Sequence, residues 1–252
     1  MKTPVKTPVL VAASAYGADL VRRLGHAELV PIVAAAGAAG LEIRRELFAG
    51  PQDLDALREL ILKHKLFSVY SVPLELFEVD GKFARADLEQ AMFEARQVQA
   101  RYLKVSLGHF SAASDLQAAL GWIRQAPVEV LLENDQTAQG GRLEPIISFL
   151  ALCSGNGVTV GMTFDMGNWR WNQVDPDAAA RALAPHVRYV HCKGVRDDGG
   201  KLKAVPLEAQ DVEWPKLMAY FPKGIQRAIE FPLVGNDLEE VTRRYVALLA
   251  SV

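Results

Sequence analysis

The chain has 252 residues, and half of them are hydrophobic, which is enough for one large α/β domain or two small ones. Its net charge of −2 argues against a nucleic-acid-binding protein, because such proteins usually carry a basic excess. The two cysteines, Cys153 and Cys192, cannot form a disulfide framework, so we expect a reducing, cytoplasmic location. No apolar run approaches the roughly 18 residues that span a membrane, so no membrane partner is expected.

The first apolar run, residues 9–13, has two interpretations. Lys2 and Lys6 precede it, so the start of the chain faintly resembles a secretion signal. A first buried strand is the preferred interpretation, because the run is short and no disulfide-rich domain follows it.

Strand-like and helix-like segments then alternate along the whole chain. Helical periodicity follows each strand, with apolar residues three or four positions apart. The predicted strands are residues 8–14, 40–43, 66–72, 102–106, 128–134, 158–165, 187–193 and 225–230.

Several residues mark predicted ends of these segments. Pro73 is expected to close the third strand, and Asp175 followed by Pro176 to begin a helix. Ser111 or Ser114 is the expected cap of the helix after the fourth strand, and Asn236 that of the last helix. The Gly-rich, acidic residues 197–200 read as part of a long polar loop.

Eight strand–helix units of about 31 residues each predict a single (β/α)₈ barrel over residues 1–252. The main alternative is an open doubly wound sheet, whose first strand-to-helix turn should carry a glycine-rich phosphate loop. Residues 14–18 hold one glycine, so that fingerprint is absent.

Metal-competent side chains stand at or near the ends of the last four strands: Glu133, Asp165, His191 and Glu230. In such barrels the carboxyl ends of the strands meet at one rim and carry the active site. A single strand-end carboxylate or histidine is usually structural, but four successive ones after apolar runs need a common explanation. The pattern therefore predicts that these four side chains bind one metal ion.

Three carboxylates and one imidazole suit Mn²⁺, Mg²⁺ or Co²⁺ better than a thiolate-bound structural zinc. Four protein ligands leave open positions on an octahedral ion, which the adjacent oxygens of a hydroxy-ketone can fill. Such an ion would acidify the neighbouring C–H, and a carboxylate beside it could take the proton.

Strand alternation predicts that His191 and Lys193 face the barrel interior while Cys192 faces the helices. Lys193 could hold a substrate carboxylate or phosphate, or form a salt bridge. His109 could line the mouth or be an exposed loop residue.

Two further pairs of residues each have two possible interpretations. Trp169 and Trp171 could form an apolar wall for a sugar or anchor their loop. Glu42 and Arg44 could be a structural ion pair or substrate contacts.

With these motifs in place, the chain resembles the xylose-isomerase-like (β/α)₈ superfamily of sugar isomerases, ketose 3-epimerases, related dehydratases and a DNA-repair endonuclease. The resemblance rests on residues 132–134, 164–168, 190–193 and 229–230. The gaps of 32, 26 and 39 residues between the four ligand positions are similar to those of the family. It implies that Glu133, Asp165, His191 and Glu230 bind the metal, with Mn²⁺ preferred over Mg²⁺, Co²⁺ or Zn²⁺. It also implies that Glu133 and Glu230 are the acid/base pair, acting through an enediolate.

The sequence departs from the ketose epimerases at two positions. Asn168 stands where they commonly have a histidine, and Arg196 lies five residues after His191 rather than six. These two departures argue against an ordinary ketohexose epimerase. The predicted substrate contacts are Asn168, Trp169, Lys193 and His109.

The resulting functional hypothesis is a metal-dependent isomerase or epimerase of a small keto-sugar, sugar acid or sugar phosphate. The alternative is a dehydratase of the inosose or dehydroshikimate type, which uses the same proton abstraction. A non-catalytic sugar-binding barrel is a weaker alternative, and a DNA-repair endonuclease is disfavoured, because only five histidines are present. We expect a carbohydrate substrate and no nucleic-acid partner. The sequence does not give the oligomeric state, for which a homo-oligomer is the default.

Overall fold

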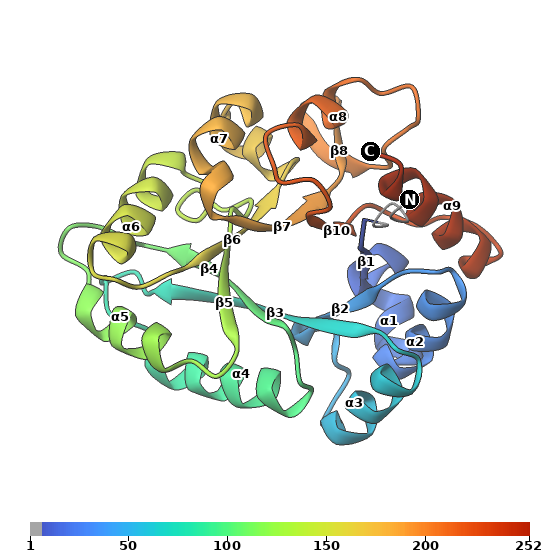
Figure 1. Cartoon of the computed structure of the whole chain (residues 1–252), viewed down its shortest axis with the longest axis horizontal. Coiled ribbons are helices and arrows are strands. Elements are labelled where there is room, and N and C mark those ends of the chain that lie inside the picture. The colour runs from blue at the N-terminus through green and yellow to red at the C-terminus, as the bar shows by residue number, and fades with distance from the viewer. Residues whose placement is uncertain (1–6) are drawn as a thin grey trace, which may run out of the picture.

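A computed structural model describes residues 7–252 as a closed barrel of eight parallel strands surrounded by helices (Figure 1). This confirms the predicted (β/α)₈ architecture. Neighbouring strands follow the chain order around the barrel, and β1 pairs with β10 to close it. The barrel strands are β1 (Val9–Ala12), β2 (Gly40–Arg44), β3 (Phe67–Phe77), β4 (Tyr102–Gly108), β5 (Glu129–Glu133), β6 (Gly161–Asp165), β7 (Val187–Cys192) and β10 (Gln226–Ile229).

The helices pack their apolar faces on the outside of this barrel, as their sequence periodicity predicts. They are α1 (Ala18–Leu24), α2 (His26–Ala35), α3 (Leu54–Lys63), α4 (Arg85–Gln97), α5 (Leu116–Gln125), α6 (Leu143–Gly155), α7 (Pro176–Leu183), α8 (Glu213–Met218) and α9 (Leu238–Ala250). Within residues 7–252 no helix combines the length and the apolar character needed to cross a membrane. Lys2 and Lys6 lie outside the described residues, and residues 9–12 form the predicted first strand.

The helix caps agree with the sequence at one position and differ at two. Asp175 caps α7, with Pro176 in its first turn. The side chain of Asp115, rather than Ser111 or Ser114, caps α5, and Asp237 rather than Asn236 caps α9. In both corrected cases the carboxylate accepts the backbone N–H three residues later, which the flanking side chains do not do.

Pro73 does not end the third strand, contrary to the prediction. β3 continues to Phe77, and its pairing with β4 shifts between Ser71 and Glu75. Proline lacks the N–H that a ladder requires, so it is tolerated at this interruption.

The segment after β7 forms a hairpin instead of the predicted long loop. β8 (Gly194–Asp198) pairs antiparallel with β9 (Lys201–Val205). Gly199 and Gly200 turn the chain at φ of +64° and +86°, a backbone region that favours glycine. The polar side chains concealed this hairpin because its strands are short and exposed.

The barrel interior consists of two layers of different chemistry. An apolar layer fills the end nearer the strand N-termini: Leu10, Val69, Tyr102, Leu131, Tyr189 and Ala228. Above it, two residues further along several of these strands, lie charged and polar side chains, including Glu42, Lys104, Glu133 and His191. This upper layer opens at the carboxyl ends of the strands.

Candidate metal centre

The four predicted ligands converge in the upper layer. Glu133 and Asp165 end β5 and β6, His191 lies in β7, and Glu230 follows β10. Asp165 pairs in register with His191, so the adjacent strands bring them together. One donor atom from each of the four residues lies within 4.8 Å of the other three.

The donor atoms have the arrangement that a metal ion requires. His191 Nδ1 lies 2.9 Å from Glu133 Oε1, 3.0 Å from Glu230 Oε2 and 3.6 Å from Asp165 Oδ2. Ligand atoms that each lie about 2.1 Å from one ion are separated from one another by distances similar to these three. Glu133 Oε1, Asp165 Oδ2 and His191 Nδ1 are buried and make no hydrogen bond, and Asp165 Oδ2 has an ion pair with Lys193 Nζ at 2.8 Å. Buried polar atoms rarely lack partners, so this convergence fits a bound cation.

The loop after β6 aims Asp165 at this centre. Its Oδ1 accepts hydrogen bonds from the backbone N–H groups of Gly167 and Asn168, which leaves Oδ2 for the centre. The Asn134 side chain accepts from Asp165 N and donates to Asp165 O. The Leu-Glu-Asn stretch at the end of β5 therefore supplies a predicted ligand, Glu133, and a side chain, Asn134, that holds the neighbouring strand end in place.

Asn168 and Trp169 support this loop from within. Asn168 donates to Asn134 O and accepts from Gln136, so both ends of its amide have a protein partner. Trp169 has no exposed surface and packs against Phe164 with ring centroids 5.6 Å apart. Both side chains are buried in this loop, and their predicted contacts with substrate stay predictions. The burial of Trp169 favours the second sequence interpretation, a loop anchor.

Glu42 fixes the orientation of His191. Its carboxylate Oε2 lies 2.6 Å from His191 Nε2, and both side chains are fully buried. Because a carboxylate can only accept, Nε2 carries a proton, and Nδ1 is the ring nitrogen that faces the three carboxylates. Such carboxylate–histidine pairs set the tautomer and basicity of metal-binding histidines. Glu42 also lies 3.5 Å from Arg44, so the predicted ion pair is present.

Lys104 of β4 is a member of the centre that the sequence interpretation missed. Its Nζ donates to Glu133 Oε2 at 2.6 Å and lies 3.2 Å from Glu42 Oε1, with 1% of the side chain exposed. The available signal was a lysine at an inward position of a buried strand, between Tyr102 and Ser106. A buried lysine requires carboxylate partners, and the interior offers two.

Two other cations hold Glu230. Arg44 donates to Oε1 at 2.9 Å, and Lys193 donates to Oε2 at 2.8 Å. Lys193 also lies 2.8 Å from Asp165 Oδ2. Lys193 therefore faces the interior as predicted, and in this structure it forms the salt bridge of the two interpretations.

These contacts shift the protonation equilibria of the ligands. Burial alone would raise the pKa of Glu133, but Lys104 and His191 outweigh it and keep that pKa below its usual range. The pKa of Glu230 is likewise held well below normal by His191 and Lys193 against the effect of burial. Burial raises the pKa of Asp165 in spite of Lys193. Both glutamates are therefore ionised at neutral pH, as metal ligands must be.

His109 follows β4 and is partly exposed, and its Nε2 lies 3.8 Å from Glu75 Oε2. Its predicted contact with substrate stays a prediction.

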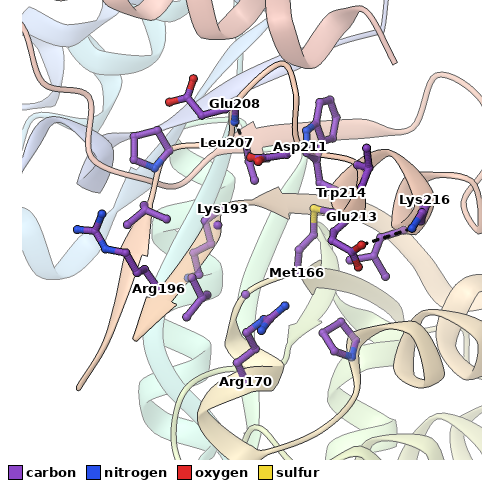
Figure 2. Close-up of a pocket in the computed structure, with 18 of the residues that line it drawn as sticks. Met166, Arg170, Lys193, Arg196, Leu207, Glu208, Asp211, Glu213, Trp214 and Lys216 are labelled. Atoms are coloured by element: carbon purple, nitrogen blue, oxygen red, sulfur yellow. Dashed lines mark hydrogen bonds and ion pairs between the residues drawn. The ribbon is translucent and has the colours of Figure 1, made fainter. Parts of the chain in front are cut away.

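A cavity of about 800 Å³ adjoins the centre on one side (Figure 2). It lies among the loop after β6, the β8–β9 hairpin and α8, and it reaches the centre through Lys193. The stem of Lys193 passes close to Gly167, where an added Cβ would stand 2.8 Å from Lys193 Cγ. A glycine at this position thus makes room for Lys193 between centre and cavity.

Comparisons with known proteins gave matches in structure only. No protein-family model and no curated protein sequence matches the chain. A xylose isomerase domain containing protein from Salmonella typhimurium has a TM-score of 0.72 at 16% identity, over 96% of this chain and 97% of that one.

The chain has the fold of the xylose-isomerase-like barrels. Two other similar structures agree. A probable 3-DHS dehydratase, AsbF, from Bacillus anthracis has a TM-score of 0.69 at 13% identity, over 97% of this chain and 99% of its own. D-Psicose 3-epimerase with D-tagatose from Clostridium cellulolyticum has a TM-score of 0.63 at 11% identity, over 96% of both chains. These matches confirm the fold that the sequence resemblance implied, and they include both candidate reaction classes.

Proposed function

We propose that the protein is a metal-dependent isomerase or epimerase of a small keto-sugar, sugar acid or sugar phosphate. The observation that carries the proposal is the convergence of Glu133, Asp165, His191 and Glu230 with three buried donor atoms that make no hydrogen bond. The similar folds of an epimerase and a xylose isomerase domain support the reaction class as an analogy.

The donor set suits Mn²⁺, with Mg²⁺, Co²⁺ and Zn²⁺ as alternatives. When bound, the ion would supply Lewis-acid polarisation of a substrate carbonyl. Glu133, Asp165, His191 and Glu230 would hold it, with Glu42 fixing the histidine.

Glu133 and Glu230 are the proposed acid/base pair. Each directs one oxygen to the centre, where it lies about 3 Å from His191 Nδ1. The other oxygen is held by Lys104 in one case and by Arg44 in the other. These clamps keep both carboxylates ionised and oriented, so that they can take a proton from a substrate carbon and return it.

A dehydratase is the second candidate, because a probable 3-DHS dehydratase shares the fold over nearly the whole chain. It would use the same proton abstraction, and a hydroxyl on the next carbon would then leave as water. Homo-oligomerisation and a cytoplasmic location stay predictions.

The test is incubation of the Mn²⁺-loaded protein with ketoses, uronates and sugar phosphates in D₂O, followed by NMR and mass spectrometry. An isomerase or epimerase incorporates solvent deuterium without loss of water, whereas a dehydratase releases water. Glu230→Gln should abolish turnover while the folded state remains, and Glu59→Gln on the exposed face of α3 is the matched control. Full activity of Glu230→Gln would remove that residue from the mechanism.

A further inference from the structure

The cavity beside Lys193 has charged walls of two kinds. Figure 2 shows Arg196 and Lys193 toward the left, Arg170 below, Glu208 and Asp211 above, and Glu213 with Lys216 toward the right. The cavity is therefore lined by charges of both signs, and Lys193 connects it to the metal centre.

Most of the acidic groups around the cavity already have partners. Asp175 caps α7, Asp177 binds Arg181 and Tyr220, Asp211 accepts from Glu208 N, and Glu213 pairs with Lys216. The guanidinium groups of Arg170 and Arg196 have no hydrogen-bond or ion-pair partner within residues 7–252, and the Glu208 carboxylate has none there either. The two guanidinium groups and the Glu208 carboxylate are therefore available to bind a ligand. Glu208 lies on the opposite side of the cavity from Arg170 in Figure 2.

We infer that the substrate is an anion whose carboxylate or phosphate group binds in this cavity between Arg170 and Arg196, while its carbonyl end reaches the metal centre past Lys193. The inference rests on the proposed function for the carbonyl end only, because the oxyanion contacts come from the cavity. A cavity of about 800 Å³ has room for a sugar acid or sugar phosphate. Arginine is suited to this task since its planar fork matches both oxyanions.

The experiment is calorimetric titration of the protein with inorganic phosphate and, separately, with acetate. Both titrations are made on the wild type and on His191→Ala without added metal, which removes direct binding of the anion to an ion. Arg170→Gln and Arg196→Gln should each weaken the binding of the preferred anion by roughly tenfold to a hundredfold, as expected for a lost charged hydrogen bond. Arg23→Gln, an exposed residue of α1 with the same charge change, should leave it unaltered.

The outcomes separate the two proposals. Anion binding that persists in His191→Ala and weakens in Arg170→Gln supports the oxyanion site, whatever the metal content. The preferred anion, phosphate or acetate, identifies the group. Absence of binding of both anions to the wild type, or equal binding by the Arg170→Gln/Arg196→Gln double variant, would overturn the inference and leave the metal centre untouched.

Discussion

The lower and upper layers of the barrel interior both contain fully buried side chains, and they are chemically opposite. Leu10, Val69 and Leu131 of the lower layer are fully shielded from solvent, and so are Glu42 and His191 above them. The lower layer removes apolar surface from water, which stabilises the fold. The upper layer removes charged groups from water, which costs free energy. The attraction within buried ion pairs commonly offsets no more than this desolvation cost.

The difference indicates where the chain favours activity over stability. Apolar residues of similar volume would fill the upper layer with equal or greater stability, since buried ion pairs can often be replaced in this way. Lys104, Glu42 and their partners instead hold four donor atoms around one point. We therefore assign stability to the lower layer and chemistry to the upper one.

The largest effect is expected from Lys104→Met. This change leaves Glu133 and Glu42 without their shared buried cation, which should lower the free energy of unfolding by about 3–5 kcal/mol. Urea denaturation of the metal-free protein measures it, with Lys63→Met on exposed α3 as control. An unchanged urea concentration at the midpoint of unfolding would mean that the upper layer tolerates unpaired carboxylates.

Leu131→Ala tests the lower layer. Removal of this fully buried side chain should cost about 2–5 kcal/mol through lost burial and a residual cavity. Metal stoichiometry should stay that of the wild type, because the ligands lie a layer above. Loss of metal together with stability would show that the layers are coupled.

His26 should make stability depend on pH. Its Nε2 accepts the backbone N–H of Arg44, and burial lowers the pKa of His26 from 6.5 to about 4. Between these values the unfolded chain binds a proton that the folded chain does not. Stability is therefore complete above pH 6.5 and declines as the pH falls toward 4.

The His26 contribution amounts to about 3 kcal/mol across that range. Denaturation curves of the wild type and His26→Asn at several pH values isolate it from other titrating groups. Parallel pH profiles for the two proteins would rule it out.

The smallest effect is expected at Glu42. Glu42→Leu removes the acceptor that orients His191, so metal affinity should fall about 10- to 100-fold. Glu42→Gln keeps an acceptor and should lose less. Glu46→Gln is the control, because Glu46 pairs with Arg44 and not with the histidine. Metal titration gives the dissociation constants, and equal values for all variants would separate Glu42 from the centre.

The sequence pattern predicted those features that depend on regular periodicity. Alternation along β7 placed His191 and Lys193 inside, and strand ends located the four side chains whose donor atoms converge. It did not predict Lys104, because one lysine in an apolar strand reveals no partner until the barrel brings Glu42 and Glu133 beside it. The hairpin after β7 escaped for a different reason, since its strands are short and exposed.

The most direct test of the account is the metal content of the purified protein, measured by mass spectrometry for the wild type and His191→Ala. About one divalent ion per chain in the wild type, and none in the variant, is the predicted result. No bound ion after incubation with Mn²⁺, Mg²⁺, Co²⁺ and Zn²⁺ would contradict the metal centre and with it the proposed chemistry.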